Sequence, residues 1–328
     1  MQRKPKILVA GSFVMDLIAS AKHAPQSGQT LMGESFHMAP GGKGANQAVQ
    51  CARLGAEVTM VGCVGGDIFA GKLLEATRES GVDVSHVKTD PAACSGIGHV
   101  LLEVTETSAQ NRITVISGAN LSLTLDDVAW IKDAVGAYDM VLLQMEIPLE
   151  VNLQIARWAR DAGVPVMLNP APAAALCPEF VACADYLTPN EQEAAAETGC
   201  PLHTDRDSVS EEEVLAAAKV LREKGGRNII ITLGRHGSAV VQGDLIRFVP
   251  RVDMPHVSDP TAAGDSFVAA LAVGLCRGMT EEQALTFASH TAAITVSRMG
   301  AMPSLPTMAE VRLLLEDRRP EGFDFSLL

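Results

Sequence analysis

Ten residues, Ser258-Asp259-Pro260-Thr261-Ala262-Ala263-Gly264-Asp265-Ser266-Phe267, combine a turn, a run of small side chains and an acidic residue. The ring of Pro260 disfavours the helical conformation at Asp259, so the stretch begins in a turn. Apolar residues recur at helical spacing from Phe267 onward, which predicts a buried helix. The first turn of a helix has free N–H groups and a positive dipole end, and both suit an anion.

Asp265 places one carboxylate in the same turn as this expected anion site. The small residues at 262–264 would let a phosphate reach the backbone. Phosphoryl transfer to a hydroxyl needs charge stabilisation and a base that takes the proton, and this stretch offers both. A second interpretation is that Asp265 only favours the helix N-terminus through the dipole. The stretch by itself leaves both interpretations open.

Composition narrows the class of protein. The 328 residues are 47% hydrophobic and 20% charged, which suffices for one large α/β domain or two. The net charge of −13 argues against a nucleic-acid-binding protein. Seven cysteines without a CxxC pair predict reduced thiols in a cytoplasm rather than disulfides or a zinc site. We expect neither a membrane span nor a signal peptide, because no apolar run is long enough and the first residues lead straight into a strand.

Strands alternate with helices along the chain, which predicts a mainly parallel sheet covered on both faces. Its strands are expected at 6–10, 58–62, 139–144, 164–168, 186–188 and 228–232, followed by a hairpin of 238–241 and 245–249 around Gly243-Asp244. Helices are expected at 48–54, 67–80, 125–135, 149–162, 211–224, 281–296 and 308–316, with others opening at Pro189 and after Gly264. Strands at 17–21, 30–39, 97–104 and 112–116 would form a small lid.

A second glycine-rich stretch, Pro40-Gly41-Gly42-Lys43-Gly44-Ala45-Asn46-Gln47-Ala48, precedes a helix. Its spacing matches neither a Walker A loop nor GxGxxG. It either binds a ligand or is a tight turn with a solvated lysine.

Other polar residues are also ambiguous. Asp16 lies among apolar residues, either at an exposed strand position or as an acceptor for ligand hydroxyls. Glu146 follows a strand end, where ligands bind in open α/β sheets. Asn190 and Glu193 open a helix and either cap it or face a ligand.

Taken together, the motifs resemble those of the ribokinase family of carbohydrate kinases, in the family's order and over nearly the whole chain. In chain order they are Gly11-Ser12 with Asp16, Gly41-Gly42-Lys43-Gly44-Ala45-Asn46, Gln144-Met145-Glu146, Asn169-Pro170-Ala171-Pro172, Pro189-Asn190-Glu191, Thr232-Leu233-Gly234 with Gly237, and Ala262-Ala263-Gly264-Asp265. The resemblance implies a ribokinase-like three-layer α/β fold, a mainly parallel sheet with helices on both faces plus a small β lid. It also implies a single kinase domain, residues 1–328, with lid strands from about 13–40 and 97–117.

The resemblance further implies ATP-dependent phosphorylation of D-ribose at O5, giving D-ribose 5-phosphate and ADP. Asp265 would be the general base, and the backbone of Ala262, Ala263 and Gly264 would form the anion hole. The residues that would hold the sugar are Asp16, Gly42, Lys43, Asn46 and Glu146. The residues that would line the nucleotide site are Asn190, Thr232, Leu233, Gly234, Arg235, Gly237, Gly264 and Ser289.

Cations and a partner copy are implied in the same way. Glu193 would place Mg²⁺ through water, since Mg²⁺ keeps much of its hydration shell. A K⁺ site would be formed, mostly through backbone oxygens, by Asp259, Thr261, Thr295, Arg298, Gly300 and Ser304. The lid would also form a homodimer contact, and the enzyme would be cytoplasmic.

Two positions depart from the pattern of ribokinases. Val14 stands where asparagine is usual, and it cannot hydrogen-bond a sugar hydroxyl. This resembles the deoxyribokinase branch, so 2-deoxy-D-ribose is an alternative substrate, and another sugar or a nucleoside is possible within the family. Pro260 replaces a common threonine and removes one N–H near the cation loop, but it leaves the carbonyls in place.

Two other functions fit part of the sequence. A nicotinamide dehydrogenase would share a first strand that ends at a glycine, but no GxGxxG follows that strand. A non-catalytic sugar-binding regulator could keep the fold, although the complete loop around Asp265 argues against it.

Overall fold

Alternation of side chains in β1 (Lys6–Ala10) decides how the body is layered. Ile7 and Val9 point into one apolar cluster, and Leu8 and Ala10 point into another on the opposite face of the sheet. The computed structural model describes residues 3–104, 109–173, 175–205, 208–243 and 245–328. Both faces of the central strand are therefore buried, as the continuous apolar run predicts.

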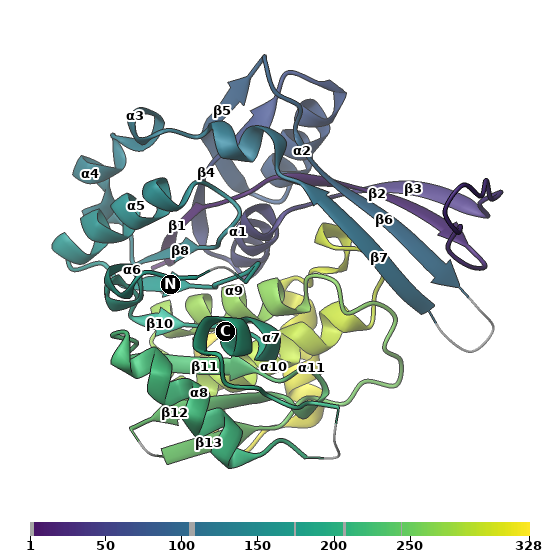
Figure 1. Ribbon diagram of the computed structural model, residues 1–328. Coiled ribbons are helices and arrows are strands. Elements are labelled where there is room, and N and C mark those ends of the chain that lie inside the picture. The colour runs from purple at the N-terminus through teal and green to yellow at the C-terminus, as the bar shows by residue number, and fades with distance from the viewer. Residues whose placement is uncertain (1–2, 105–108, 174, 206–207, 244) are drawn as a thin grey trace.

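The body is built on a nine-stranded sheet in the order β13-β12-β11-β10-β9-β8-β1-β4-β5 (Figure 1). All neighbours are parallel except β11 with β12 and β12 with β13. This confirms the predicted mainly parallel sheet with a terminal hairpin. The strands after β1 are β4 (Glu57–Gly65), β5 (Val82–Asp90), β8 (Met140–Leu143), β9 (Val166–Leu168), β10 (Tyr186–Leu187), β11 (Asn228–Thr232), β12 (Ser238–Gln242) and β13 (Leu245–Val249).

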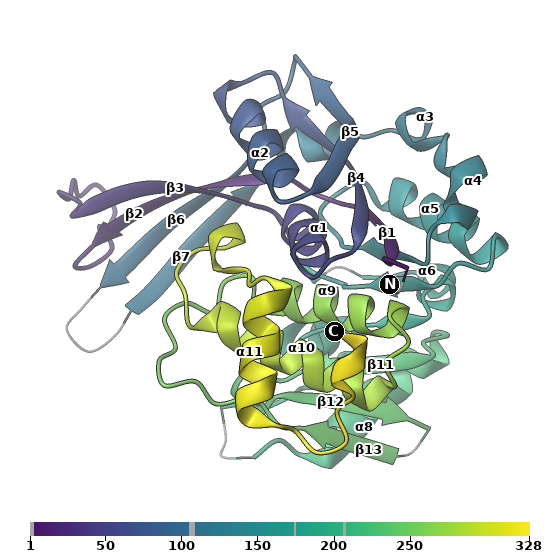
Figure 2. The same ribbon diagram turned by 180° about the vertical axis from the view of Figure 1, so that it is seen from behind.

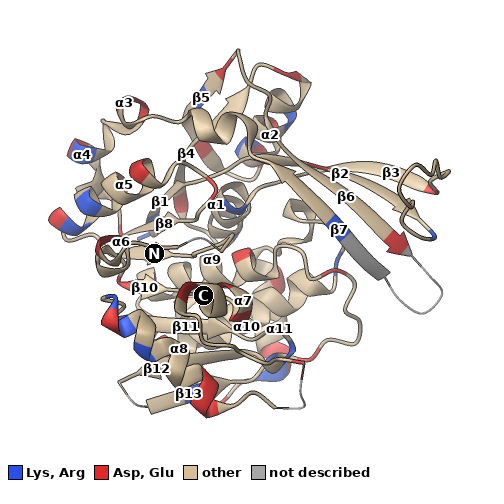
Figure 3. Cartoon of the chain, in the orientation of Figure 1, with Lys and Arg blue, Asp and Glu red and all other residues tan. Residues whose placement is uncertain are grey.

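Helices cover both faces of this sheet. One face carries α1 (Lys43–Arg53), α2 (Ile68–Glu79), α9 (Ala263–Cys276), α10 (Glu281–Val296) and α11 (Met308–Arg318), seen in Figure 2. The other carries α3 (Leu125–Val128), α4 (Ile131–Ala134), α5 (Leu149–Asp161), α6 (Pro178–Cys183), α7 (Glu191–Thr198) and α8 (Glu211–Glu223). Among the described residues, none of the helices has both the length and the apolar character needed to cross a bilayer. Acidic and basic residues are interspersed over the body (Figure 3).

A second, four-stranded sheet projects from the body as the expected lid (Figures 1 and 2). Its order is β3-β2-β6-β7, and only β2 and β6 run parallel. The strands are β2 (Val14–Ala21), β3 (Ser35–Gly41), β6 (Gly96–Val104) and β7 (Ala109–Ile116). The lid segments predicted at 17–21, 97–104 and 112–116 fall within β2, β6 and β7. The broader lid range 97–117 also includes 105–108, which lie outside the described residues.

Several predicted boundaries were wrong. The strand expected at 30–39 begins only at Ser35, because its partner strand β2 ends at Ala21 and pairing begins between Ser35 and Ser20. The helix expected at 125–135 is split, and hydrogen bonds three residues apart join its halves, such as that from the Lys132 N–H to the Ala129 carbonyl.

Other elements were missed or misplaced. Strand β5 and the six-residue α6 were missed, although β5 alternates between buried and exposed positions. Helix α1 begins at Lys43, inside the glycine-rich stretch rather than after it. The expected turn at Gly243-Asp244 includes Asp244, which lies outside the described residues.

Candidate functional site

The N-terminus of α9 is shaped to receive an anion. Ala262, the residue before the helix, adopts φ 60°, a left-handed conformation that costs an L-residue with a side chain about 1–2 kcal/mol. A Cβ built on Gly264 would meet nothing within 4 Å, so the backbone faces open space there. The first-turn N–H groups have no partners within the helix, and that of Ala263 donates to the Pro260 carbonyl before it at 3.2 Å. The structure thus places Ala262, Ala263 and Gly264 where the sequence predicts an anion site.

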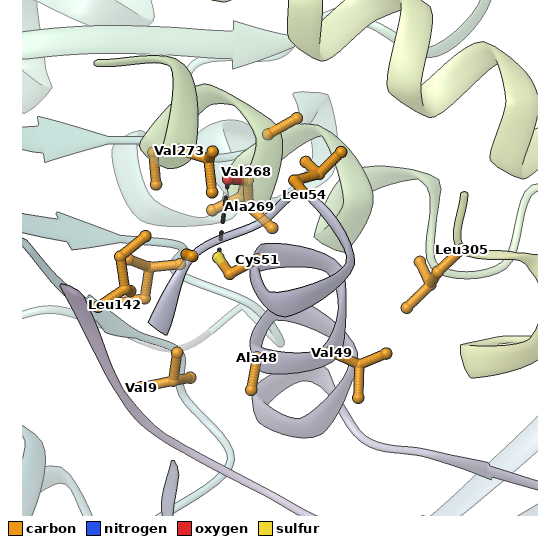
Figure 4. Packing of buried hydrophobic residues seen from close by; sticks show 14 of the residues in the cluster. Val9, Ala48, Val49, Cys51, Leu54, Leu142, Val268, Ala269, Val273 and Leu305 are labelled. Carbon is orange, nitrogen blue, oxygen red and sulfur yellow. Dashed lines mark hydrogen bonds between the residues drawn. The ribbon is translucent and has the colours of Figure 1, made fainter. Parts of the chain in front are cut away.

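Asp265 is 6% exposed and is held by two amides from α1. Asn46 Nδ2 donates to its Oδ2 over 2.9 Å, and Gln47 Nε2 donates to its Oδ1 over 3.1 Å. Helices α1 and α9 pack side by side, and Figure 4 shows Cys51 Sγ of α1 bonded to the Ala269 carbonyl of α9 at 3.7 Å. The two glycine-rich stretches, distant in sequence, therefore form one site.

At the start of α1 the backbone packs closely against the segment that follows β1. Gly42 has φ 96°, and a Cβ there would lie 2.7 Å from the Val14 nitrogen. A Cβ on Gly44 would lie 2.5 Å from the Ser12 nitrogen. Only glycine fits at these two points, and this brings α1 against the end of β1.

Glu146 is tied to the same junction. Its Oε2 accepts hydrogen bonds from Ser12 Oγ and from the Lys43 backbone N–H, the latter at 3.1 Å. Ser12 follows β1 and Glu146 follows β8, so both lie at the carboxyl edge of the parallel sheet. Asn46 Oδ1 is buried and has no hydrogen-bond partner among the described residues, so it can accept a bond from a ligand hydroxyl.

Asp16 lies on lid strand β2 and is partly buried. Burial, followed by the like charges of Glu146 and Asp259, raises the pKa of Asp16 to about 7. A Cβ on Gly98 of β6 would lie 2.1 Å from Asp16 Oδ1, so the carboxylate lies in the space that a larger residue at this position would fill. The alternative of an ordinary exposed strand position does not fit this environment.

Two cavities meet at Gly264. The smaller, of about 180 Å³, is lined by Asp265, Lys43 and Glu193 together with Asn169, Thr188 and Ala262. The larger, of about 360 Å³, runs beneath α10. Asn190, Thr232, Pro260 and Gly264 line both of them. A ligand in the larger cavity can therefore present one end to Asp265.

The larger cavity contains most of the predicted nucleotide residues, namely Asn190, Thr232, Gly234, Gly237, Gly264 and Ser289. Leu233 instead lies in the apolar core, and the Arg235 guanidinium donates to the Asp205 carbonyl at 2.8 Å. The segment 251–254 with Val257, and Ala292, Ala293 and Val296 of α10, also line this cavity and were missed. The loop residues among them belong to no recognisable motif, so the sequence did not indicate that they line a cavity.

Lys43 is surrounded by carboxylates. Burial lowers the pKa of Lys43, but the charges of Asp265, Glu146 and Glu193 outweigh burial and raise it overall. The ammonium group therefore stays protonated in the cavity that it shares with Asp265.

Of the two roles considered for Asn190 and Glu193 from sequence, the structure shows helix capping. Asn190 Oδ1 accepts from the Glu193 N–H at 2.7 Å, and Glu193 Oε2 accepts from the Asn190 N–H at 2.8 Å, which is a capping box for α7. Both residues also line the smaller cavity. Burial raises the pKa of Glu193. Within the described part of the chain, no cluster of three or more His, Cys, Asp or Glu side chains forms a direct metal site.

Asp259 joins two of the predicted cation-binding loops. Its Oδ1 accepts from the Thr261 N–H at 2.9 Å, and its Oδ2 accepts from the Gly300 N–H at 2.9 Å. Three other side chains are engaged elsewhere. Thr295 Oγ1 donates to Ser266, Ser304 Oγ donates to the Ala301 carbonyl, and Arg298 pairs with Glu310 at 2.6 Å. Of these three, Arg298 can face a cation only through its backbone oxygen, because a guanidinium has no acceptor.

Comparison with known proteins agrees with this geometry. Residues 4–308 match the description "pfkB family carbohydrate kinase". A ribokinase of Bacillus subtilis is 37% identical over 309 residues, which cover 94% of this chain and 99% of that protein. A deoxyribokinase of Salmonella typhi is 32% identical, covering 93% of this chain and 96% of that protein.

Solved structures are similar as well. Arabidopsis thaliana ribokinase complexed with ribose and ATP superposes with a TM-score of 0.85 at 32% identity, covering 96% of this chain and 99% of the plant chain. The fold is therefore the ribokinase-like three-layer fold with a lid.

The raised pKa of Asp16 leads to a stability prediction. The folded protein keeps the Asp16 proton up to about pH 7, whereas an ordinary aspartate releases it near pH 3.8. Stability is therefore lost as the pH rises between these values. Asp16→Asn removes this penalty and should stabilise the ligand-free protein at pH 8 by about 1–3 kcal/mol, which is a rise in Tm of a few degrees.

Thermal melts at pH 5 and pH 8 test this. The gain should be smaller at pH 5, and Asp133→Asn, at an exposed aspartate, is the matched control and should change Tm little at either pH. A loss of stability in Asp16→Asn at pH 8, or an equal gain at both pH values, would contradict the account.

Proposed function

Because the chain belongs to the pfkB family of carbohydrate kinases, we propose that it transfers the γ-phosphate of ATP to O5 of D-ribose, giving D-ribose 5-phosphate and ADP. One observation carries the proposal. Asp265 lies beside a helix N-terminus at the point where a nucleotide-sized cavity meets a smaller polar one. Membership of a kinase family also removes the dehydrogenase interpretation.

The residues divide the chemistry between them. Asp265 takes the proton of the attacking hydroxyl, and the N–H groups at 262–264 stabilise charge on the phosphoryl group. Lys43, placed in the same cavity, adds a positive charge near that group. Because its side chain lies with Asp265 and Glu193, we assign Lys43 to the phosphate as well as to the sugar.

The sugar is held between the body and the lid. Asp16, Asn46 and Glu146 offer acceptors for several hydroxyls, and Gly42 lets the backbone approach. The nucleotide lies in the larger cavity against Asn190, Thr232, Gly234, Gly237 and Ser289.

Two cations fit the donor groups. Glu193, a buried carboxylate at the smaller cavity, would hold Mg²⁺ through water, and Mg²⁺ supplies charge neutralisation on the phosphates. The Asp259 carboxylate and the backbone carbonyls of the 259–261 and 298–304 loops suit K⁺. If K⁺ serves there, replacing KCl by choline chloride should lower kcat, and an unchanged kcat would remove K⁺ from the proposal.

We also propose that residues 1–328 act as one cytoplasmic kinase domain that forms a homodimer through the lid. Phe36 on β3 and Val115 on β7 are 62% and 54% exposed, which leaves apolar lid surface for a second copy. Analytical ultracentrifugation should show a dimer of the wild type, and Val115→Glu should weaken its association. A monomeric wild type would contradict the proposed dimer. Fractionation of cells would test the compartment.

Deoxyribose remains a second candidate because of Val14. Val14 lies two residues before Asp16 on β2, so its side chain is on the same face of the lid sheet. Val14 pairs with Gly41 of β3 on one side and with Gly96 of β6 on the other. Its apolar side chain offers no hydrogen bond to a 2-hydroxyl.

Replacing the proposed base should stop turnover. Asp265→Asn keeps the size of the side chain but cannot accept the proton, so kcat should fall by at least about 10²–10⁴-fold while ADP still binds. A coupled ADP-release assay and calorimetry with ADP measure the two effects. The matched control is Asp67→Asn at the N-cap of α2, which should keep full activity. Full activity of Asp265→Asn would refute the assignment of the base.

The identity of the sugar substrate is determined by comparing kcat/KM for D-ribose and 2-deoxy-D-ribose in the same assay. We expect ribose to be preferred, and Val14→Asn to increase that preference by about 5–30-fold through a new hydrogen bond, whereas Val14→Ala should not. A wild-type preference for deoxyribose would replace the ribose assignment by the alternative. Absence of ADP release with any sugar would favour the non-catalytic regulator.

A further inference from the structure

A buried glutamine that no cavity exposes contacts the proposed base. Gln47 is 0% exposed and bonds to Asp265 Oδ1, but it is not among the described residues that line either cavity. Asn46 is also absent from both linings, but it keeps a buried oxygen without a partner among the described residues, which a ligand hydroxyl can use. The amide of Gln47 is instead engaged at both ends by protein groups, namely Asp265, Asn169 and Gln144. Gln47 is therefore placed to act on Asp265 and not on the sugar.

Two further amides contact Gln47, and a third holds the backbone of one of them. Gln144 Nε2 donates to Gln47 Oε1 over 2.7 Å, and Gln47 Nε2 also approaches Asn169 Oδ1 at 3.3 Å. The backbone of Gln144 is held in turn, since its backbone carbonyl accepts from Asn152 Nδ2 over 2.6 Å. These residues come from α1, from the ends of β8 and β9, and from α5. The network anchors Gln47 to the rigid edge of the sheet.

The direction of this hydrogen-bond chain follows from the charge of Asp265. An ionised carboxylate only accepts, so the NH₂ group of Gln47 must face it. The Gln47 oxygen is then left to accept from Gln144, which turns Gln144 Oε1 toward Gly11. A Cβ on Gly11 would lie 2.1 Å from that oxygen, so only glycine leaves room for this arrangement.

A competing partner explains why the base needs such support. Lys43 lines the same small cavity as Asp265 and carries a positive charge. Without a fixed donor on Oδ1, the carboxylate could turn toward the Lys43 ammonium and form an ion pair. In that orientation it would be withdrawn from the sugar hydroxyl, and a displacement of about 1 Å can cost about 10²-fold in rate.

We propose that Gln47, held in place by Gln144, is a positioning residue that fixes the Asp265 carboxylate in the orientation in which it takes the proton from the sugar hydroxyl. This inference rests on the proposed kinase function and adds a residue to it. Gln47 touches neither substrate, so it affects the rate of the chemical step and not the affinity for sugar.

The test uses methionine, which has a similar volume but donates no hydrogen bond. Gln47→Met should lower kcat by about 10–100-fold and leave the KM for ribose within about threefold. Gln144→Met, one step further from the base, should lower kcat by about fivefold. The double variant should be no slower than Gln47→Met, because both substitutions act through the same contact.

Gln50→Met is the matched control. Gln50 is one turn further along α1, equally buried, and bonds to the Pro306 carbonyl and Ser266 Oγ rather than to Asp265. It should lower Tm about as much as Gln47→Met while kcat stays within about twofold. An equal loss of kcat in Gln50→Met, or a kcat within twofold of wild type in Gln47→Met, would reduce Gln47 to a structural role.

A crystal structure of Gln47→Met gives a readout that does not depend on activity. We expect the Asp265 carboxylate to leave its wild-type rotamer or to occupy more than one. A single, unchanged rotamer would overturn the proposal whatever the kinetics. If wild-type protein releases no ADP with any sugar, the proposed function fails, and the rotamer of Asp265 still decides whether Gln47 positions it.

Discussion

The two hydrogen bonds from α1 to Asp265 are the contacts on which the site depends. They join a helix that begins at Lys43, inside the first glycine-rich stretch, to one that begins at Ala263, and they run between side chains that are almost fully buried. Burying a carboxylate is costly unless its oxygens are hydrogen-bonded. The packing of α1 on α9 (Figure 4) therefore serves both stability and function, because it brings amide donors to the one charge that the reaction needs.

The same region concentrates negative charge. Glu146, Glu193 and Asp265 lie around Lys43, and burial with the like charges of Glu146 and Asp259 raises the pKa of Asp16 to about 7. Such an arrangement is unfavourable in the free protein but offers many acceptors to a polyhydroxylated ligand. The left-handed conformation of Ala262 stores strain at the same place. We interpret these features as costs in folding stability that the protein bears because they preorganise the site for its ligands.

Sequence reasoning predicted the layered fold and the lid, because strand alternation is a local signal, whereas the meeting of the two glycine-rich stretches was implied only by the resemblance to the family. It missed residues whose role arises only in three dimensions. Gln47 looks like any polar helix residue until Gln144 and Asp265 lie beside it, and Gly98 is explained only by the carboxylate of Asp16 across the strand pair. The loop 251–257 carries no motif at all. Leu233 and Arg235 belong to the right segment, but their side chains point to the core and to Asp205.

The central claim is that this site moves a phosphoryl group onto the primary hydroxyl of ribose. The most direct measurement is ³¹P NMR of the protein mixed with MgATP and D-ribose. The account predicts ADP and one new phosphomonoester resonance, split by two equivalent-sized couplings to the protons on C5. A doublet from an ester at C1, or inorganic phosphate without any sugar ester, would contradict it.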